Sequence, residues 1–385
     1  TLLSLTMTLT PCSMSALAAQ ENSRDFSLFF SGPGVAALSS GDEYSEYQWA
    51  LNNTGRFAQE KVLNIKTLDH IYLHYGENGI DDIALPPLGP DNFESINTDA
   101  VANIDINIED AWKTYSETEN KRTVTVAIID TVSNDSFRLK RFHLVNEDEI
   151  PGDGIDNDGN GYVDDVNGWN FVSNSNEICT GEEEATEHGA GTIAAAWNNG
   201  GIAGITDSTH VKLMVLKALG GSEGKGSPES VIEAIKYAEA NGADICNLSF
   251  GSSNALPIEA AIRDSKMLFV VAAGNGNQYQ IGYDIDKSPD TRQVFPTTMN
   301  YLGNLLFNGH LDESSNYGAT SVDLAAPGTY ILSTIPGDSY AYMSGTSMAA
   351  PMVTGAAALI YSARTDLSLQ DIKTAILSTV HNWPR

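Results

Sequence analysis

From residue 123 onwards, short apolar runs alternate with longer segments in which apolar residues recur at helical spacing. The short runs are about five to eight residues long and rich in valine, isoleucine and leucine, which is typical of strands buried on both faces. The longer segments reach about ten residues or more, as amphipathic helices do. This alternation predicts a doubly wound α/β fold, in which helices cover both faces of a mostly parallel sheet.

The pattern gives each predicted element a range. We expect strands over 123–130, 210–219, 243–251, 266–275, 321–328 and 329–335. We expect helices over 227–243, 256–265, 347–363 and 368–380. The first of these helices has a proline at its start and a glycine near its end, which is typical of helix boundaries. From 47 to 115 the pattern is irregular, and we assign no element there.

The first 45 residues differ in composition from the rest. Residues 1–19 are apolar, small and uncharged, and they end near an Ala-x-Ala cleavage pattern at 16–18. We therefore expect 1–19 to be part of a signal peptide, which predicts a secreted protein. Residues 20–45 are predicted to be a linker or a remnant of a propeptide, and 46–385 to form one large domain. No later run reaches the ~18 apolar residues of a membrane-spanning helix.

Composition and charge narrow the class of protein. Of the 385 residues, 42% are hydrophobic, which is enough for a sizeable core, and the formal net charge is −29. This charge excludes nucleic acid as a partner, because phosphate binding needs a basic face. We expect a monomer that tolerates divalent cations. We predict no disulfide between Cys179 and Cys246, because two cysteines without further context are weak evidence for one.

Three polar residues lie where this architecture gathers its chemistry, at the carboxyl ends of strands. Asp130 ends the first predicted strand, and Asn275 follows a later one. Ser347 lies where a long helix of small residues begins, so its surroundings favour a developing anion. Ser347 taken alone is equally an N-cap residue. However, Pro351 inside the same helix breaks a local rule, and broken local rules tend to mark functional sites.

A single histidine completes this set of candidates. His188 stands before Gly189, Ala190 and Gly191, and an alanine-rich run follows that is predicted to form a buried helix. A histidine at the start of such a helix is either a general base or a polar cap residue. The residues around it do not decide between these two roles.

Several motifs together resemble the subtilisin-like serine peptidases, or subtilases. They are VAIIDT at Asp130, HGAGTIAA at His188, AAGN at Asn275 and GTSMAAP at Ser347, and they follow one another in the order that this family uses. YQWALNNTG, GNGYVDDVNGWNFV and SNYGATSVDLAAPG are further close matches. The resemblance covers roughly residues 47 to 379 and implies a subtilisin-like fold and a serine endopeptidase.

The resemblance implies a role for each matching residue. Ser347 would be the nucleophile, His188 the general base and Asp130 the group that orients the histidine. The amide of Asn275 would bind the oxyanion together with the backbone N–H of Ser347. A polypeptide substrate would lie as an added strand between two edges of the protein. One edge is implied at Ser249, Phe250 and Gly251, and the other at Gly224 and Gly226.

The sequence departs from the family's pattern at the histidine. Three residues are absent between His188 and Thr192 when this segment is compared with the family's usual His-Gly-Thr-His-Val-Ala-Gly-Thr. If the segment is aligned from the left, His188 is the catalytic histidine. If it is aligned from the right, Ala185 takes the catalytic position and the enzyme is inactive. We favour the left alignment because it keeps the His-Gly pair.

Other departures are a valine at position 132, a shortened stretch between 295 and 315, and a chain that stops before the family's usual last strand. The valine replaces a glycine that is used there for unusual backbone angles, so it implies strain or a rearranged loop. The early stop predicts that the domain is truncated at its C-terminus.

A separate acidic loop predicts a structural calcium site. Its candidate ligands follow the start of a calcium-binding loop and then close the coordination: Asp156, Asp158, Asn160, Asp164 and Asp165. The complete EF-hand pattern fails, because its twelfth position is Asn167 rather than glutamate. The alternative is an acidic, glycine-rich turn that is held by bonds from side chains to the backbone.

The sequence thus favours a secreted serine endopeptidase with an Asp-His-Ser triad. The first alternative is a catalytically impaired homologue that binds peptides or serves as a scaffold. The second is a calcium-stabilised adhesion module, which explains the acidic loop but not the residues around Ser347.

Overall fold

The computed structural model describes residues 48–53, 55, 71–73, 100–131, 144–178, 202–220, 225–251, 255–276, 281–287, 300–335 and 339–380. Within these ranges a seven-stranded parallel sheet has the order β3-β4-β2-β5-β6-β7-β8. Its strands are β2 (Val124–Asp130), β3 (Gly168–Asn170), β4 (Val211–Lys217), β5 (Ile245–Leu248), β6 (Leu268–Ala272), β7 (Asn300–Leu305) and β8 (Leu324–Pro327).

Both faces of this sheet are buried, which explains the continuous apolar runs. Along β2, Val124, Val126 and Ile128 belong to one hydrophobic cluster, while Ala127 and Ile129 belong to another. Successive side chains of a strand point to opposite faces, so each face needs its own apolar set. The predicted doubly wound α/β fold is therefore confirmed.

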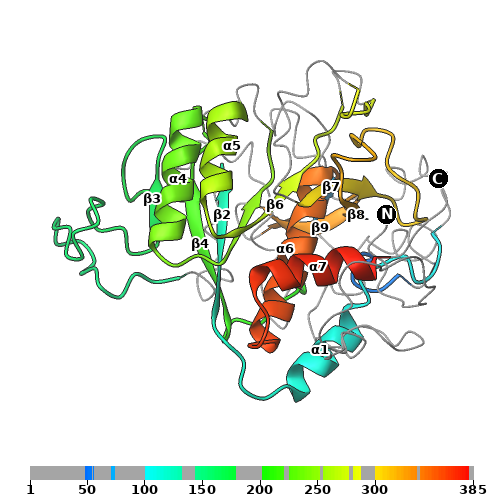
Figure 1. Ribbon diagram of the computed structural model, residues 1–385, viewed down its shortest axis with the longest axis horizontal. Coiled ribbons are helices and arrows are strands. Elements are labelled where there is room, and N and C mark those ends of the chain that lie inside the picture. Colours follow the sequence, from blue (N-terminus) through cyan, green and yellow to red (C-terminus); the bar gives the residue numbers. More distant parts are fainter. Residues whose placement is uncertain are drawn as a thin grey trace, which may run out of the picture.

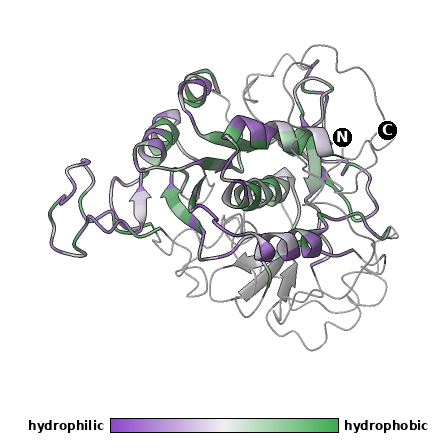
Figure 2. Cartoon of the chain, turned by 60° about the horizontal axis from the view of Figure 1, so that its bottom comes forward, coloured by the Kyte–Doolittle hydropathy of each residue, from purple (hydrophilic) through white to green (hydrophobic). Residues whose placement is uncertain are grey.

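Helices cover the two faces in pairs (Figure 1). On one face lie α4 (Pro228–Ala240) and α5 (Ala255–Asp264), and on the other lie α6 (Thr346–Ala363) and α7 (Leu369–Thr379). Figure 2 shows hydrophobic residues gathered at the centre, between the helix layers. Almost every residue of α6 is buried, as a helix that is hydrophobic all round requires.

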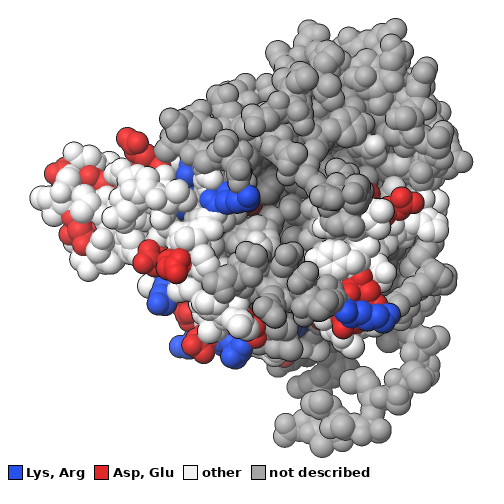
Figure 3. Space-filling model, turned by 90° about the horizontal axis from the view of Figure 1, so that it is seen from above, with Lys and Arg blue, Asp and Glu red and all other residues white. Residues whose placement is uncertain are grey.

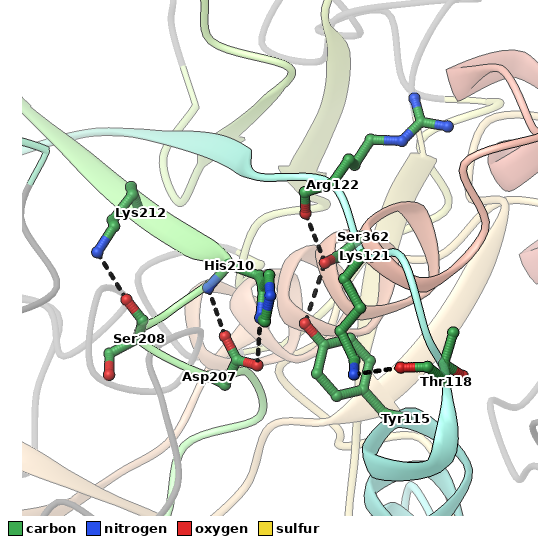
Figure 4. Close-up of polar contacts among 9 residues, drawn as sticks. All are labelled: Tyr115, Thr118, Lys121, Arg122, Asp207, Ser208, His210, Lys212 and Ser362. Carbon is green, nitrogen blue, oxygen red and sulfur yellow. Dashed lines mark hydrogen bonds and ion pairs between the residues drawn. The ribbon is translucent and has the colours of Figure 1, made fainter.

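Two further features lie in or beside regions where we assigned no element. Helix α1 (Ile108–Glu117) buries Ile108, Ala111, Trp112 and Tyr115 on the same side as α6. The hydroxyl of Tyr115 shares a hydrogen bond of 3.0 Å with that of Ser362, near the far end of α6 (Figure 4). A small second sheet joins β1 (Ile71–Leu73), β10 (Ser339–Met343) and β9 (Ile331–Ile335), in that order.

The other predicted elements form close to their expected ranges, and β3 is an addition to the main sheet, as is β7. It lies in the stretch between 295 and 315 that looks shortened in the sequence, and it pairs with β6 on one side and β8 on the other. The predicted signal peptide and linker, residues 1–45, lie outside the described residues. Among the helices that the structure describes, none has both the length and the apolar character needed to cross a bilayer.

The topology fixes where chemistry is expected. The chain leaves β2 towards β3 and β4 on one side, and then crosses to β5 on the other side, so the order of strands reverses beside β2. In open parallel sheets the ligand-binding crevice lies outside the carboxyl ends of the strands at such a point. Asp130 ends β2, Ser249 follows β5 and Asn275 follows β6, so all three belong to this edge.

Candidate active site

Two reciprocal hydrogen bonds join the end of β5 to the first turn of α6. The hydroxyl of Ser347 donates to the carbonyl oxygen of Ser249 over 2.7 Å. The hydroxyl of Ser249 donates in return to the carbonyl oxygen of Ser347 over 3.0 Å. Ser347 is 9% exposed, so its side chain lies at the boundary between the core and the crevice. The predicted nucleophile is therefore at the carboxyl edge of the sheet, and β5 contacts it directly.

Asn275 is held in one orientation by the residue before Ser347. The backbone N–H and the hydroxyl of Thr346 both donate to Asn275 Oδ1, over 2.8 and 3.0 Å. A backbone N–H can only donate, so the oxygen of the amide must face Thr346. The amide Nδ2 is therefore left to donate elsewhere. The hydroxyl of Thr346 also accepts from Gly274 N–H over 3.0 Å, which ties the same loop to α6 a second time.

Gly345 lets these segments approach each other. Its φ of 151° is a conformation that L side chains rarely adopt. A Cβ on this residue would also stand 3.1 Å from Asn275 Nδ2 and 3.4 Å from its Oδ1. A side chain here would therefore strain the backbone and push on the asparagine at the same time.

Asn316 holds the loop that carries Asn275 from the other side. Its Oδ1 accepts from Gly276 N–H over 3.0 Å, and its Nδ2 donates to the carbonyl of Ala273 over 2.9 Å. Its backbone N–H donates to Gly274 over 2.9 Å. Neither Asn316 nor Thr346 was given a role from the sequence, although both lie inside quoted motifs.

Asp130 is buried at the end of β2, with 2% exposure. Its Oδ1 accepts from Thr131 N–H over 2.8 Å, and its carbonyl accepts from Ala218 N–H over 3.0 Å. The buried Lys217 is its register partner on β4, so both side chains leave the sheet on the same face. His188, Val132 and the shortened histidine segment lie outside the described residues.

The two predicted substrate edges lie beside this region. Lys225 exchanges backbone hydrogen bonds of 2.9 and 3.0 Å with Gly220. Gly226 comes close to the neighbouring segment, because a Cβ on this residue would stand 2.1 Å from the carbonyl oxygen of Ala218. On the other edge, Ser249 is buried and Gly251 is exposed, while Phe250 packs against the core cluster below α4. Gly224 lies outside the described residues.

The acidic loop projects from the body of the protein on the β3 side (Figure 1). The segment 144–178 contains no lysine or arginine, and its projecting tip shows acidic but no basic side chains in Figure 3. Carboxylate oxygens of Glu149, Asp158 and Asp165 lie within 4.8 Å of one another. Oxygens that share a calcium ion at about 2.4 Å lie no farther apart than about 4.8 Å, so this group fits calcium.

The five predicted ligands divide into two groups in this loop. Asp158 and Asp165 belong to the cluster, which gains Glu149 as a member that the sequence pattern did not indicate. Asp156 accepts from the N–H groups of residues 160 and 161, and Asp164 accepts from those of residues 152 to 154. These two carboxylates therefore shape the backbone, as the alternative interpretation of an acidic turn predicts for the whole loop.

The remaining predicted ligand, Asn160, lies between the two cluster carboxylates. Its Nδ2 donates to Asp158 over 3.0 Å and to Asp165 over 2.9 Å. Burial acts to raise the pKa of Asp158, but hydrogen bonds from Asn146 and Asn160 outweigh it and leave the pKa lowered. Asp158 therefore stays ionised, which suits a cation ligand.

The cluster is anchored to helix α4 by Tyr237. The hydroxyl of Tyr237 donates to Asp165 Oδ2 over 2.5 Å. Its ring packs edge-on against those of Tyr162 and Phe171, with centroids 5.0 and 5.7 Å apart. Burial and the nearby Asp165 raise the pKa of Tyr237, so its proton stays available for this hydrogen bond.

The chain is similar in sequence to several known proteins. Residues 121–384 match the model of the subtilase family. The chain is 36% identical over 212 residues to the major intracellular serine protease of Bacillus subtilis (strain 168), which covers 51% of this chain and 62% of that protein. It is 33% identical over 225 residues to subtilisin DY of Bacillus licheniformis, which covers 56% and 77%. It is 35% identical over 216 residues to subtilisin Savinase of Lederbergia lenta, which covers 55% and 75%.

Proposed function

Because the chain belongs to the subtilase family, we propose that it is a serine endopeptidase that hydrolyses peptide bonds through Asp130, His188 and Ser347. The observation that carries the proposal is the junction of β5, α6 and the Asn275 loop at one edge of the sheet. That junction puts a serine hydroxyl and a fixed amide at a helix N-terminus, as acyl transfer requires.

The proposed reaction starts with attack of Ser347 Oγ on the carbonyl carbon of the scissile peptide. His188 takes the serine proton as the new C–O bond forms, and later gives it to the leaving amine. Asp130 orients the imidazole and stabilises its charged form. Water then attacks the acyl-enzyme while His188 takes a proton from that water. His188 gives this proton to Ser347 Oγ as the bond between the serine and the acyl group breaks.

Asn275 Nδ2 and the backbone N–H of Ser347 would bind the oxyanion. This role is supported by the two hydrogen bonds from Thr346, which hold the oxygen of the amide and leave Nδ2 as the available donor. A donor that is fixed before the reaction needs no reorganisation when charge develops. The helix N-terminus adds a partial positive charge at the same place.

The substrate would bind as an added strand. The support comes from the exposed position of Gly251, which follows β5. The carbonyl of Ser249 receives the hydroxyl of Ser347 in the free protein. The serine hydroxyl must therefore turn towards His188 before it can react.

We also propose calcium as a structural ion of the acidic loop, held by Glu149, Asp158 and Asp165. Glu149 and Asp165 are buried carboxylates, and burying negative charge without a countercharge is costly. A bound Ca²⁺ supplies that countercharge through the oxygen ligands it prefers. Its role would be to stabilise the loop rather than to take part in peptide hydrolysis. Secretion is proposed from residues 1–19 alone.

Labelling with a fluorophosphonate tests the proposed activity. Ser347 Oγ should attack the phosphorus and displace fluoride, so the intact mass should rise by one adduct and peptide mapping should locate it on the peptide that contains Ser347. The Ser347→Ala variant should fold with the same circular dichroism spectrum and carry no adduct. A folded wild-type chain that never labels would instead support the catalytically impaired homologue.

A further inference from the structure

Pro351 leaves one carbonyl of the first turn of α6 without its usual donor. In an α-helix the carbonyl of each residue accepts from the N–H four positions later. Ser347 is four residues before Pro351, and proline has no N–H to give. The carbonyl oxygen of the serine residue is therefore open to a donor from outside the helix.

The hydroxyl of Ser249 takes the place of that donor. It donates to the carbonyl oxygen of Ser347 over 3.0 Å, although the two residues are 98 positions apart in the sequence. Ser249 is only 1% exposed, so water does not compete for this contact. A buried carbonyl that finds no partner loses the hydrogen bonds that water would give it, so Ser347 O needs this donor.

A second layer fixes the direction of the Ser249 hydroxyl. A hydroxyl has one hydrogen, and Ser249 gives it to Ser347, so towards Asn247 it can only accept. Asn247 Nδ2 supplies that hydrogen bond over 2.9 Å, which turns Asn247 Oδ1 towards α6. There it accepts from the hydroxyl of Thr354 over 2.8 Å. Both Asn247 and Thr354 are fully buried.

We propose that Ser249, Asn247 and Thr354 are positioning residues for the Ser347 nucleophile. Thr354 lies one helical turn beyond the proline and orients Asn247. Asn247 in turn orients Ser249, whose hydroxyl replaces the missing N–H of Pro351. The relay sets the position of the first turn of α6 against β5, and with it the position of the Ser347 hydroxyl and backbone N–H. This inference rests on the proposed peptidase function, and it adds to Ser249 a role beyond its place on the substrate edge.

The relay is expected to affect chemistry more than substrate binding. If the hydroxyl of Ser249 is removed, Ser347 O and Asn247 Nδ2 lose their partners, and the first turn shifts to find others. A displacement of the reacting atom by about 1 Å can cost about 10²-fold in rate. Thr354 acts from one step farther away, so its removal should have a smaller effect.

The test compares two relay variants with a matched control on the same helix. Ser249→Ala and Thr354→Val each remove one relay hydroxyl, whereas Thr354→Ser keeps it. The control is Ser362→Ala, because Ser362 is buried on α6 and its hydroxyl bonds to Tyr115 and the carbonyl of Arg122 (Figure 4). Ser362 lies near the last residue of α6, whereas Ser347 lies in its first turn. The readouts are the rate of fluorophosphonate labelling, kcat and KM on a peptide substrate, and the melting temperature.

Ser249→Ala should reduce the labelling rate and kcat by about tenfold to hundredfold with little change in KM. Thr354→Val should lose less, and Thr354→Ser should stay near the wild-type rate. Ser362→Ala should lower the melting temperature and label at the wild-type rate. Wild-type labelling rates in folded Ser249→Ala and Thr354→Val would overturn the proposal. Equal rate losses in Ser362→Ala and the relay variants would also overturn it, because the losses would then reflect lower stability of the fold and not the position of Ser347.

Failure of the peptidase function itself would look different, because the wild-type chain would not label. The relay is then tested by amide hydrogen exchange in the first turn of α6. Faster exchange at residues 346 to 348 in Ser249→Ala than in Ser362→Ala supports the link between β5 and this turn. Equal exchange in the two variants overturns it.

Discussion

The amide oxygen of Asn275 accepts two hydrogen bonds from Thr346, one from its backbone and one from its hydroxyl, at 2.8 and 3.0 Å. The residue that precedes the proposed nucleophile, Ser347, thus orients the amide proposed to bind the oxyanion. Two segments of the chain, 71 positions apart, share one small contact. Substitutions that weaken this contact should therefore lower kcat.

Replacing Asn275 or its partner should slow turnover without weakening substrate binding. Asn275→Ala should reduce kcat by about 10²–10³-fold with KM nearly unchanged, a loss known from subtilisin when one oxyanion donor is removed. Thr346→Val keeps the backbone contact and loses the hydroxyl, so it should cost less. Steady-state kinetics on one peptide substrate measure both. A rise in KM at constant kcat would assign Asn275 to substrate binding instead.

Replacing His188 decides between the two alignments of its segment. In a regular helix the three absent residues would correspond to roughly 300° of rotation and ~4.5 Å of rise, which would misplace the imidazole of His188 under the left alignment. We expect His188→Ala to abolish labelling at Ser347, while Ser362→Ala, the matched control on α6, labels normally. Labelling that survives in His188→Ala would mean that the base has been assigned wrongly.

Removing calcium should lower the melting temperature if the acidic cluster binds it. A ligand present at about a hundred times its dissociation constant stabilises the folded state by about 2.7 kcal/mol, so chelation should give a clear shift in calorimetry. Glu149→Gln and Asp165→Asn should melt at a temperature that no longer responds to calcium.

The matched control for calcium is Asp286→Asn. The Asp286 carboxylate is exposed, and it accepts from the backbone of residues 320 and 321 in a different loop. Its replacement should leave the calcium response intact. Equal responses in all three variants would place the ion elsewhere, and a wild-type chain indifferent to chelator would favour the plain turn.

Asp105 should make stability depend on pH in a definite window. Burial raises the pKa of Asp105 to about 6, although hydrogen bonds from the N–H groups of Asn53 and Asn107 oppose this. An acid whose pKa is raised on folding stabilises the folded state fully below its unfolded pKa of 3.8, and loses that contribution as pH rises towards 6. The melting temperature of Asp105→Asn, relative to that of the wild type, should therefore rise as the pH is raised from 4 to 6. A constant difference across this range would contradict the assignment.

The sequence predicts best the strands and helices whose own residues form a clear apolar pattern. Strand β2 contributes apolar residues to a hydrophobic cluster on each face of the sheet, so its apolar run is nearly continuous and easily recognised. Strand β7 has the sequence NYLGNL, in which asparagine and glycine interrupt the apolar pattern. Helix α1 does carry a local signal, because Asn107 precedes it and its buried residues Ile108, Ala111, Trp112 and Tyr115 recur at helical spacing.

The sequence predicts those candidate site residues that the local sequence around them is enough to indicate. Asp130 and Asn275 follow apolar strands and Ser347 begins a helix, so local sequence indicates them. Thr346 and Asn247 take part through Asn275 and Thr354, which lie 71 and 107 positions away. Glu149 takes part through contacts such as that with Asp164, 15 positions away. Such pairings depend on how the elements pack, and no local pattern records them.

Helix α4 gives the acidic loop and a substrate edge a common support. Its first residue, Pro228, follows the edge at Gly226 almost directly, and Tyr237 in its last turns binds Asp165 of the acidic loop. Proteins open locally in contiguous cooperative units, and a helix shared by two loops places both in one unit. The end of α6 that carries Ser347 is fastened separately, to β5. If the acidic loop binds calcium and Ser347 is the nucleophile, as proposed, removing calcium should weaken the binding of long peptides before it slows the reaction of Ser347 with a small phosphonate.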